Sequence, residues 1–245
     1  MPSARPAAKL LRTAAATLLA LALSACETSD QMASLDRMLL NDAQSAEQSR
    51  DYGAAIHHYT KLYETDRNNP AIIEPLARNL RYAGRLDDAR RLLEDTLAKL
   101  GPQPRLLVEK GKDEIGLGRA DLAAQTLSIA VQGAPTDWEA PATLAIALDR
   151  LGRYDEAAQH YNTAIARYPE NADILNNFAL SRALAGDIGK ALDLLRRAVA
   201  LPSASPKVRE NLAFLQALQQ QPPRAGKIGL PAFGLQQPDI KPESK

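Results

Sequence analysis

Few residues of this 245-residue chain have the type and spacing that catalysis or metal binding requires. Its three histidines are His57, His58 and His160. A metal site needs several converging ligands, whereas adjacent helical residues point about 100° apart, so we expect these histidines to bind no metal. The sequence contains no nucleophile elbow, P-loop or glycine-rich dinucleotide motif. We therefore expect no enzymatic activity, no catalytic residues, no cofactor and no small-molecule substrate.

The one cysteine, Cys26, lies where attachment of a lipid is expected. The first twelve residues contain three cations and no acid, namely Arg5, Lys9 and Arg12. The next thirteen, TAAATLLALALSA, are apolar but too short to span a bilayer comfortably. This order is typical of a secretory signal peptide. The stretch ends in Leu-Ser-Ala before Cys26, which matches the lipobox of bacterial lipoproteins.

A lipobox at this place predicts how the N-terminus is used. We expect residues 1–25 to be removed as a signal peptide and residues 26–35 to form a lipidated cysteine with a short tether. More than one acyl chain on Cys26 would anchor the protein stably. Glu27 follows the cysteine instead of Asp, which by the sorting rule of enteric lipoproteins predicts the outer membrane, facing the periplasm. The formal net charge of +1 gives no indication of nucleic-acid binding.

An internal repeat of 34 residues supplies the helices that would carry any binding surface. Alanines recur at this spacing without slippage, at Ala55, Ala89, Ala123, Ala157 and Ala191. A 34-residue period is that of the tetratricopeptide repeat (TPR), a helix-turn-helix unit. With these alanines at position 20, the sequence divides into an array over 36–220, comprising repeats 36–69, 70–103, 104–137, 138–171 and 172–205 and a closing helix over 206–220.

The register predicts an all-α fold, a right-handed α-solenoid of tandem TPR hairpins. Position 8, where the two helices of a hairpin approach closely, is small in every unit: Ala43, Ala77, Gly111, Ala145, Ala179 and Ala213. Glycine occupies the turn between the two helices except in the first repeat, where Arg50 stands. Pro75 falls inside a predicted helix, where it would kink the helix or delay its start. Residues 221–245 contain five prolines and no helical period, so we expect disorder there.

Binding in a TPR array usually occurs on the concave surface, formed by positions 2, 5, 9, 12 and 13 of the first helices. In the middle repeats these positions hold a mixed set with a basic cluster at Arg78, Arg81, Arg105 and Lys112. That cluster could receive an acidic or C-terminal segment of a protein partner, although charged helix faces often serve only solvation. The candidate concave surface consists of Glu74, Arg78, Arg81, Tyr82, Arg105, Val108, Lys112, Ile115, Glu139, Ile146, Asp149 and Arg150.

The C-terminal part of the array resembles the TadD lipoproteins of the tight-adherence (Tad/Flp) pilus assembly system. Three features of residues 172–213 are similar to that family: Asn176-Asn177, Ala185-Gly186-Asp187, and a last helix with Val208-Arg209-Glu210-Asn211-Leu212-Ala213. The resemblance implies a periplasmic scaffold in pilus assembly and secretion, which binds protein partners and helps to assemble or localise the outer-membrane secretin.

Three alternatives remain open at the level of sequence. The TPR lipoprotein pilotin of type IV pili and the TPR lipoprotein of the β-barrel assembly machine also combine a lipid anchor with tandem repeats. A regulator of cell-wall hydrolases, or a lipid-anchored enzyme, would belong to a different class. Asn177 and Asn211 share one register position, which favours a structural hydrogen bond between neighbouring helices over a ligand site.

Overall fold

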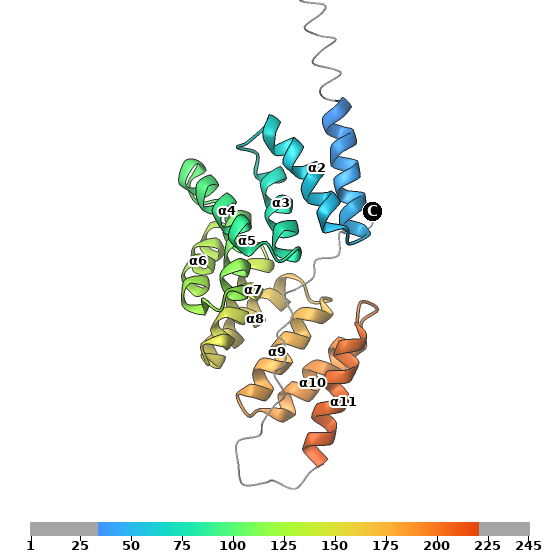
Figure 1. Cartoon of the computed structure of the whole chain (residues 1–245). Helices are drawn as coiled ribbons and strands as arrows, with labels where there is room; N and C mark the ends of the chain where they lie inside the picture. Colours follow the sequence, from blue (N-terminus) through green and yellow to red (C-terminus); the bar gives the residue numbers. More distant parts are fainter. Residues whose placement is uncertain (1–33, 221–245) are drawn as a thin grey trace, which may run out of the picture. The chain divides into compact units, whose positions relative to one another are not determined.

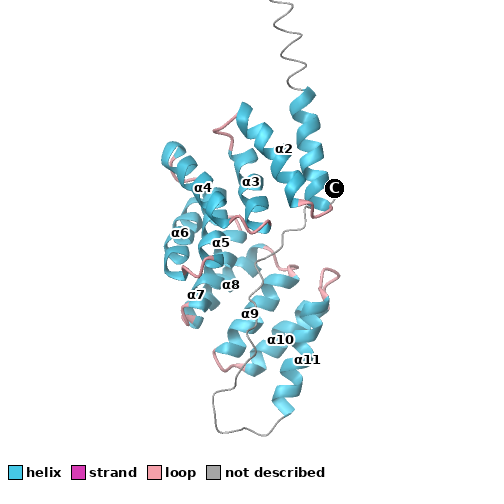
Figure 2. Ribbon diagram, in the orientation of Figure 1, coloured by secondary structure: helices cyan, strands magenta, loops and turns pink. Residues whose placement is uncertain are grey.

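A computed structural model describes residues 34–220 of the chain. The predicted signal peptide, Cys26 and most of the predicted tether lie outside the described residues, as does the segment 221–245. Within the described range every regular element is a helix (Figure 2), and none of these helices has the length and apolar character that crossing a membrane requires. The chain divides between Arg67 and Asn68 into two compact units, and each is described by itself.

The described part of the first unit is one helical hairpin. Residues 34–48 are helical, so the helix already includes the last two residues of the expected tether, and α2 (Tyr52–Thr65) follows. Ala43 and Ala55, at positions 8 and 20, are completely buried. The hydroxyl of Tyr59 donates a hydrogen bond to Glu47 Oε2 at 2.9 Å. The two helices of the hairpin therefore pack closely at the small residues Ala43 and Ala55, and the hydrogen bond from Tyr59 to Glu47 joins them.

The second unit contains four further hairpins and a closing helix (Figure 1). Its helices are α3 (Pro70–Tyr82), α4 (Leu86–Leu100), α5 (Pro104–Gly116), α6 (Ala120–Gly133), α7 (Glu139–Arg150), α8 (Tyr154–Arg167), α9 (Ala172–Leu184), α10 (Ile188–Val199) and α11 (Pro206–Gln220). The start of α3 at Pro70 shows that Pro75 does not delay this helix.

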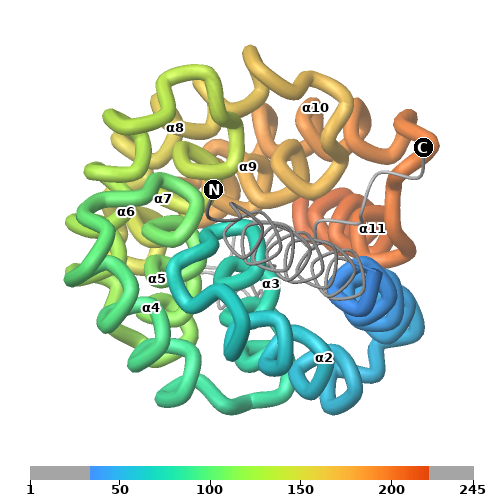
Figure 3. The backbone as a smooth tube through the Cα atoms, turned by 90° about the horizontal axis from the view of Figure 1, so that it is seen from above, coloured from blue at the N-terminus to red at the C-terminus, as the bar shows by residue number. Residues whose placement is uncertain are grey.

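The helices of the second unit form two rows. Each helix packs against the next along the chain, and α3, α5, α7, α9 and α11 also contact one another in succession. Figure 3 shows α3, α5, α7 and α9 as the inner row and α4, α6, α8 and α10 outside them. The predicted all-α fold of tandem TPR hairpins is confirmed.

The 34-residue spacing appears directly in the core. The position-20 alanines of all five repeats are completely buried, as are the large apolar residues at position 24, Tyr59, Leu93, Leu127, Tyr161 and Leu195. Close helix approach explains the small residues at position 8, because a Cβ added at Gly111 would lie 2.5 Å from Leu127.

The turn between the two helices of each repeat also recurs. Gly84, Gly118, Gly152 and Gly186 have φ between 72° and 89°, and Arg50 takes the same left-handed conformation at φ 59°. The amide after each of these residues donates to a carbonyl five residues earlier, for example Arg153 N to Leu148 O at 2.9 Å. This hydrogen bond ends the first helix and points the chain into the second.

Candidate functional site

The predicted concave surface lies on the inner row, with its residues on α3, α5 and α7. Of the twelve residues, Arg105 and Arg150 are exposed and Arg78, Tyr82 and Glu139 are half-buried. The remaining seven are buried, namely Glu74, Arg81, Val108, Lys112, Ile115, Ile146 and Asp149. Most of the charged members are held in contacts between neighbouring repeats.

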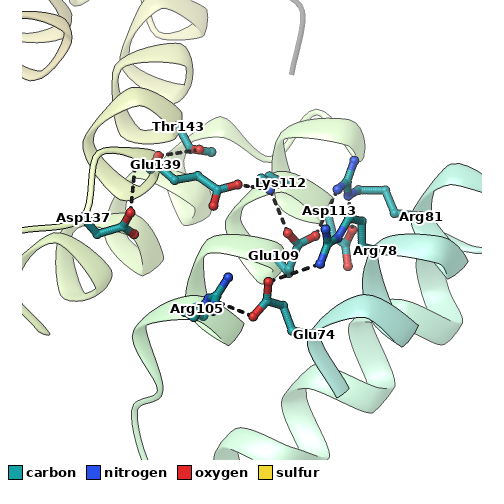
Figure 4. A network of polar contacts seen from close by, with 10 residues as sticks. All are labelled: Glu74, Arg78, Arg81, Arg105, Glu109, Lys112, Asp113, Asp137, Glu139 and Thr143. Atoms are coloured by element: carbon teal, nitrogen blue, oxygen red, sulfur yellow. Dashed lines mark hydrogen bonds and ion pairs between the residues drawn. The ribbon is translucent and has the colours of Figure 1, made fainter. Parts of the chain in front are cut away.

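Glu74 joins α3 to α5 at the start of these helices (Figure 4). Its carboxylate accepts from Arg78 Nη2 at 3.2 Å on the same helix and pairs with Arg105 Nε at 2.9 Å on the next. The Arg105 side chain remains 76 % exposed. Arg105 is therefore the cation of the predicted basic cluster that a partner can reach most easily.

Arg81 forms the centre of a second, buried contact between the same two helices. Its Nη2 donates to Glu109 Oε2 at 3.0 Å, and its Nε lies 3.4 Å from Asp113 Oδ1. All three side chains are nearly inaccessible to solvent. A guanidinium placed between two carboxylates in this way can fix the register of two helices.

Lys112 extends this network from α5 to α7 (Figure 4). Its ammonium donates to Glu109 Oε1 at 2.7 Å and to Glu139 on the following helix. Lys112 is only 1 % exposed, so its charge acts inside the array. Four of the eight groups in the network are cations and four are carboxylates: Arg78, Arg81, Arg105, Lys112, Glu74, Glu109, Asp113 and Glu139.

The carboxylates of the network have very different proton affinities. Burial alone raises the pKa of Glu109, but the charges of Lys112, Arg81 and Arg78 outweigh it and lower this pKa to about 2. Burial raises the pKa of Asp113 to about 8, against the opposing charge of Arg81. Neither oxygen of Asp113 accepts a hydrogen bond from the part of the chain that the structure describes. Asp113 therefore keeps its proton to a higher pH than an ordinary aspartic acid, whereas Glu109 loses its proton more readily than an ordinary glutamic acid.

The contacts between the later helices of the inner row contain fewer charged side chains than the contacts between α3, α5 and α7. Asp149 on α7 accepts hydrogen bonds from Ser181 on α9 at 2.6 Å and from Tyr161 on α8 at 2.8 Å. Burial raises the pKa of Asp149 to about 6. Between α9 and α11, Asn211 Nδ2 donates to Asn176 Oδ1 at 2.8 Å. The expected asparagine link is therefore made by Asn211, but with Asn176 as its partner and Asn177 beside it.

Sequence reasoning missed the acids that hold the basic cluster together. Glu109 and Asp113 occupy positions 6 and 10, outside the positions assigned to the concave surface. The structure places position 12 of one repeat against position 10 of the next, both for Arg81 with Asp113 and for Asp149 with Ser181. The opposite charges of Arg81 and Asp113, at positions 12 and 10 of adjacent repeats, were the sequence signal that could have predicted this contact.

A shallow depression in the described part of the chain is lined by residues of α6, α7 and α8 and of the turn between α7 and α8. Leu144, Leu148 and Leu151 contribute apolar side chains to it, and His160 and Gln125 contribute polar ones. Within residues 34–220, no three histidine, cysteine, aspartate or glutamate side chains converge in a way that could hold a metal ion.

Comparison with known proteins identifies the repeat. Two tetratricopeptide-repeat family profiles match, over residues 46–107 and 143–206, and together they cover about half of the chain. A curated relative, cellulose synthase operon protein C of Xanthomonas axonopodis pv. citri (strain 306), is 32 % identical over 190 residues. This match covers 71 % of the chain but only 12 % of the relative's length.

Solved structures of TPR proteins share the fold. A thermophilic TPR protein of Thermus thermophilus, TTC0263, has a TM-score of 0.68 at 16 % identity, covering 74 % of this chain and 99 % of that one. MamA of Desulfovibrio magneticus RS-1 scores 0.54 at 17 % identity, with coverages of 76 % and 98 %. YrrB scores 0.53 at 20 % identity, with coverages of 75 % and 91 %. With its helix pairs, 34-residue register and profile matches, the chain belongs to the tetratricopeptide-repeat family.

Proposed function

We propose that this protein is a lipid-anchored scaffold that binds protein partners during assembly of a Flp-type, tight-adherence pilus. The observation that carries this proposal is the combination of the Leu-Ser-Ala-Cys26 motif with the TadD-like pattern of residues 172–213. Tandem TPR hairpins generally serve as scaffolds for protein binding, which fits the absence of recognisable catalytic motifs in the sequence.

The anchor in this proposal is a lipid on Cys26 in the outer membrane, with the repeats in the periplasm. The partner is a component of the pilus machinery, and the resemblance to TadD favours the secretin. The concave surface is the proposed contact, with Arg105 and Arg150 as its exposed cations. YrrB, which has a similar fold, is described as a TPR protein with an unusual peptide-binding site.

Affinity capture of the full, lipidated chain from envelope extracts tests the proposal. We expect the pilus secretin among the captured proteins, and we expect Arg150→Glu to reduce its recovery because this change reverses a charge on the concave surface. Arg91→Glu is the matched control, since Arg91 lies on α4 in the outer row with its side chain 66 % exposed.

The captured proteins also separate the alternatives. Recovery of β-barrel assembly components, or of type IV pilus components, would replace the proposed partner with one of its rivals. Equal loss of the secretin in both arginine variants would refute the concave surface as the contact while leaving the partner in place.

A further inference from the structure

Helix α6 of the outer row exposes two large apolar side chains on the same side (Figure 3). Leu122 is 47 % exposed and Ile129 is 50 % exposed. They are separated by about two helical turns, so they share one face of the helix. Gln125 lies between them and Gln132 follows Ile129 by one turn, and both glutamines are exposed. These four residues form an uncharged surface, which we call the α6 strip.

The other repeats do not carry large apolar residues at the corresponding places. Leu122 and Ile129 occupy positions 19 and 26 of their repeat. Position 19 of the other repeats holds Ala54, Asp88, Glu156 and Lys190, and position 26 holds Lys61, Asp95, Thr163 and Arg197. The repeat fold therefore does not require the leucine and the isoleucine. A pair of exposed apolar side chains on one helix face is typical of a surface that contacts another molecule.

We propose that the α6 strip binds the α6 strip of a second copy of this chain, with the two helices antiparallel. A twofold axis close to Gln125 places Leu122 of each copy against Ile129 of the other. This reciprocal contact is the one that a twofold interface between identical chains requires.

The charges on the outer helices favour a second copy at α6 and disfavour one elsewhere. The same antiparallel pairing would place Asp88 against Asp95 on α4, and Lys190 against Arg197 on α10. Like charges in contact are unfavourable, whereas the α6 strip can meet itself without repulsion.

One cation also fits the antiparallel arrangement. Arg119 is exposed and directly precedes α6. In the pair it lies near the C-terminal end of the other α6, where unpaired carbonyl groups carry a partial negative charge. The two Arg119 side chains lie at opposite ends of the pair, so they do not repel each other strongly.

The length of α6 determines how strong this contact can be. The helix has 14 residues and is about 21 Å long. A stable interface uses about 20–30 residues from each partner, so the dimer is weak and forms at high local concentration. The α6 strip lies outside the concave surface, and the inference therefore goes beyond the proposed function. A dimer presents two concave surfaces at once, which strengthens binding to a partner with repeated sites.

Cysteine cross-linking of the full chain tests the inference. Gln125→Cys is combined with Cys26→Ser, so that the new cysteine is the only thiol. We expect mild oxidation to form a covalent dimer about ten times faster than with Gln159→Cys, because residues close to the twofold axis come within disulfide distance. Gln159 is the matched control, since it is exposed at the same position of the next repeat, on α8.

A second pair of variants separates a specific contact from random collision. Adding Ile129→Asp to Gln125→Cys should reduce the cross-linking rate to that of Gln159→Cys, because it places a charge against Leu122. Adding Thr163→Asp, at the same position on α8, should leave the rate unchanged. Ile129 is half exposed, so its replacement does not open the core.

Three results would overturn the inference. They are equal cross-linking of Gln125→Cys and Gln159→Cys, a rate that Ile129→Asp does not change, and a Cys26→Ser chain that sediments as a monomer up to about 1 mM. None of these readouts depends on a pilus partner or on the lipid, so the proposed function can fail while this inference stands.

Discussion

Asp113 illustrates how a single residue sets the charge balance of the inner row. Two buried cations, Arg81 and Lys112, face the three carboxylates Glu109, Asp113 and Glu139. Burial raises the pKa of Asp113 from 3.8 to about 8. Its contribution to stability is thus complete below pH 3.8, declines as the pH rises, and is lost above about pH 8.

Replacing Asp113 with asparagine should make stability less dependent on pH. The amide has a similar shape but does not ionise, so the cost of a surplus buried charge disappears. We expect the free energy of unfolding of Asp113→Asn at pH 8 to exceed that of the natural chain by about 1–3 kcal/mol, with a smaller difference at pH 5. Urea unfolding at both pH values measures this, and parallel pH profiles would contradict it.

Glu109→Gln is the informative counterpart, because Glu109 bonds to both Arg81 and Lys112. Removing its charge leaves two buried cations poorly compensated. We expect a loss of about 3–5 kcal/mol, measured in the same urea titration at pH 7. If Glu109→Gln lowered the free energy of unfolding no more than a substitution at an exposed position does, the network would contribute little to stability.

At this scale the sequence was only partly informative. The periodic register located Arg78, Arg81, Arg105 and Lys112, but it could not tell that Lys112 is enclosed between two glutamates. Burial and pairing depend on how side chains of different repeats meet, whereas periodicity within one repeat describes only the face on which a residue lies.

Among the elements, the first turn departs from the other four. Arg50 adopts a left-handed conformation that glycine occupies elsewhere. This conformation costs a residue with a side chain roughly 1–2 kcal/mol. Arg50→Gly should therefore stabilise the first hairpin by about 1 kcal/mol, and hydrogen exchange of amides in α2 would register the gain.

Gly152→Ala gives the matched opposite change. Gly152 has φ 72° and no atom within 4 Å of an added Cβ, so backbone strain is the only expected cost. Stabilisation by Gly152→Ala, or destabilisation by Arg50→Gly, would be inconsistent with a shared turn geometry.

The crossing of α5 and α6 makes a second prediction at the scale of elements. A Cβ at Gly111 would meet Leu127 at 2.5 Å, so the helices must separate or Leu127 must move. We expect Gly111→Ala to lower the free energy of unfolding by about 1–3 kcal/mol. Gly116→Ala on the same helix is the control, because its nearest contact would be 3.6 Å from Leu86. Equal melting temperatures for the two variants would argue against the close approach.

The elements were the most predictable level of this protein. Five alanines in a 34-residue register, with glycines in the turns, were enough to place the hairpins, because each repeat uses the same crossing and the same turn. The effect of Pro75 could not be predicted from the sequence. Whether a helix tolerates an internal proline depends on how the neighbouring side chains pack around it. In the structure Pro75 is buried within a helix that runs from Pro70 to Tyr82.

For the whole molecule, the proposed anchor gives a direct prediction. Each buried methylene of an acyl chain contributes about 0.8 kcal/mol of membrane affinity, so losing the lipid should release the protein. We expect Cys26→Ser to move the chain from the outer-membrane fraction to the soluble fraction without changing its helix content, measured by fractionation and circular dichroism. Retention of Cys26→Ser in the outer membrane would refute the lipid anchor.

The polar links between adjacent inner helices also make the order of the repeats matter. If an unequal crossover removed residues 104–137, Glu74 would face Glu139 where it now faces Arg105. Arg81 would meet Thr143 and Ala147 in the places of Glu109 and Asp113. The shortened array would keep every small residue and every turn glycine of its remaining repeats, yet lose the ion pairs that Glu74 and Arg81 now make with α5. The repeats of this protein therefore share one fold but cannot be duplicated, deleted or shuffled freely.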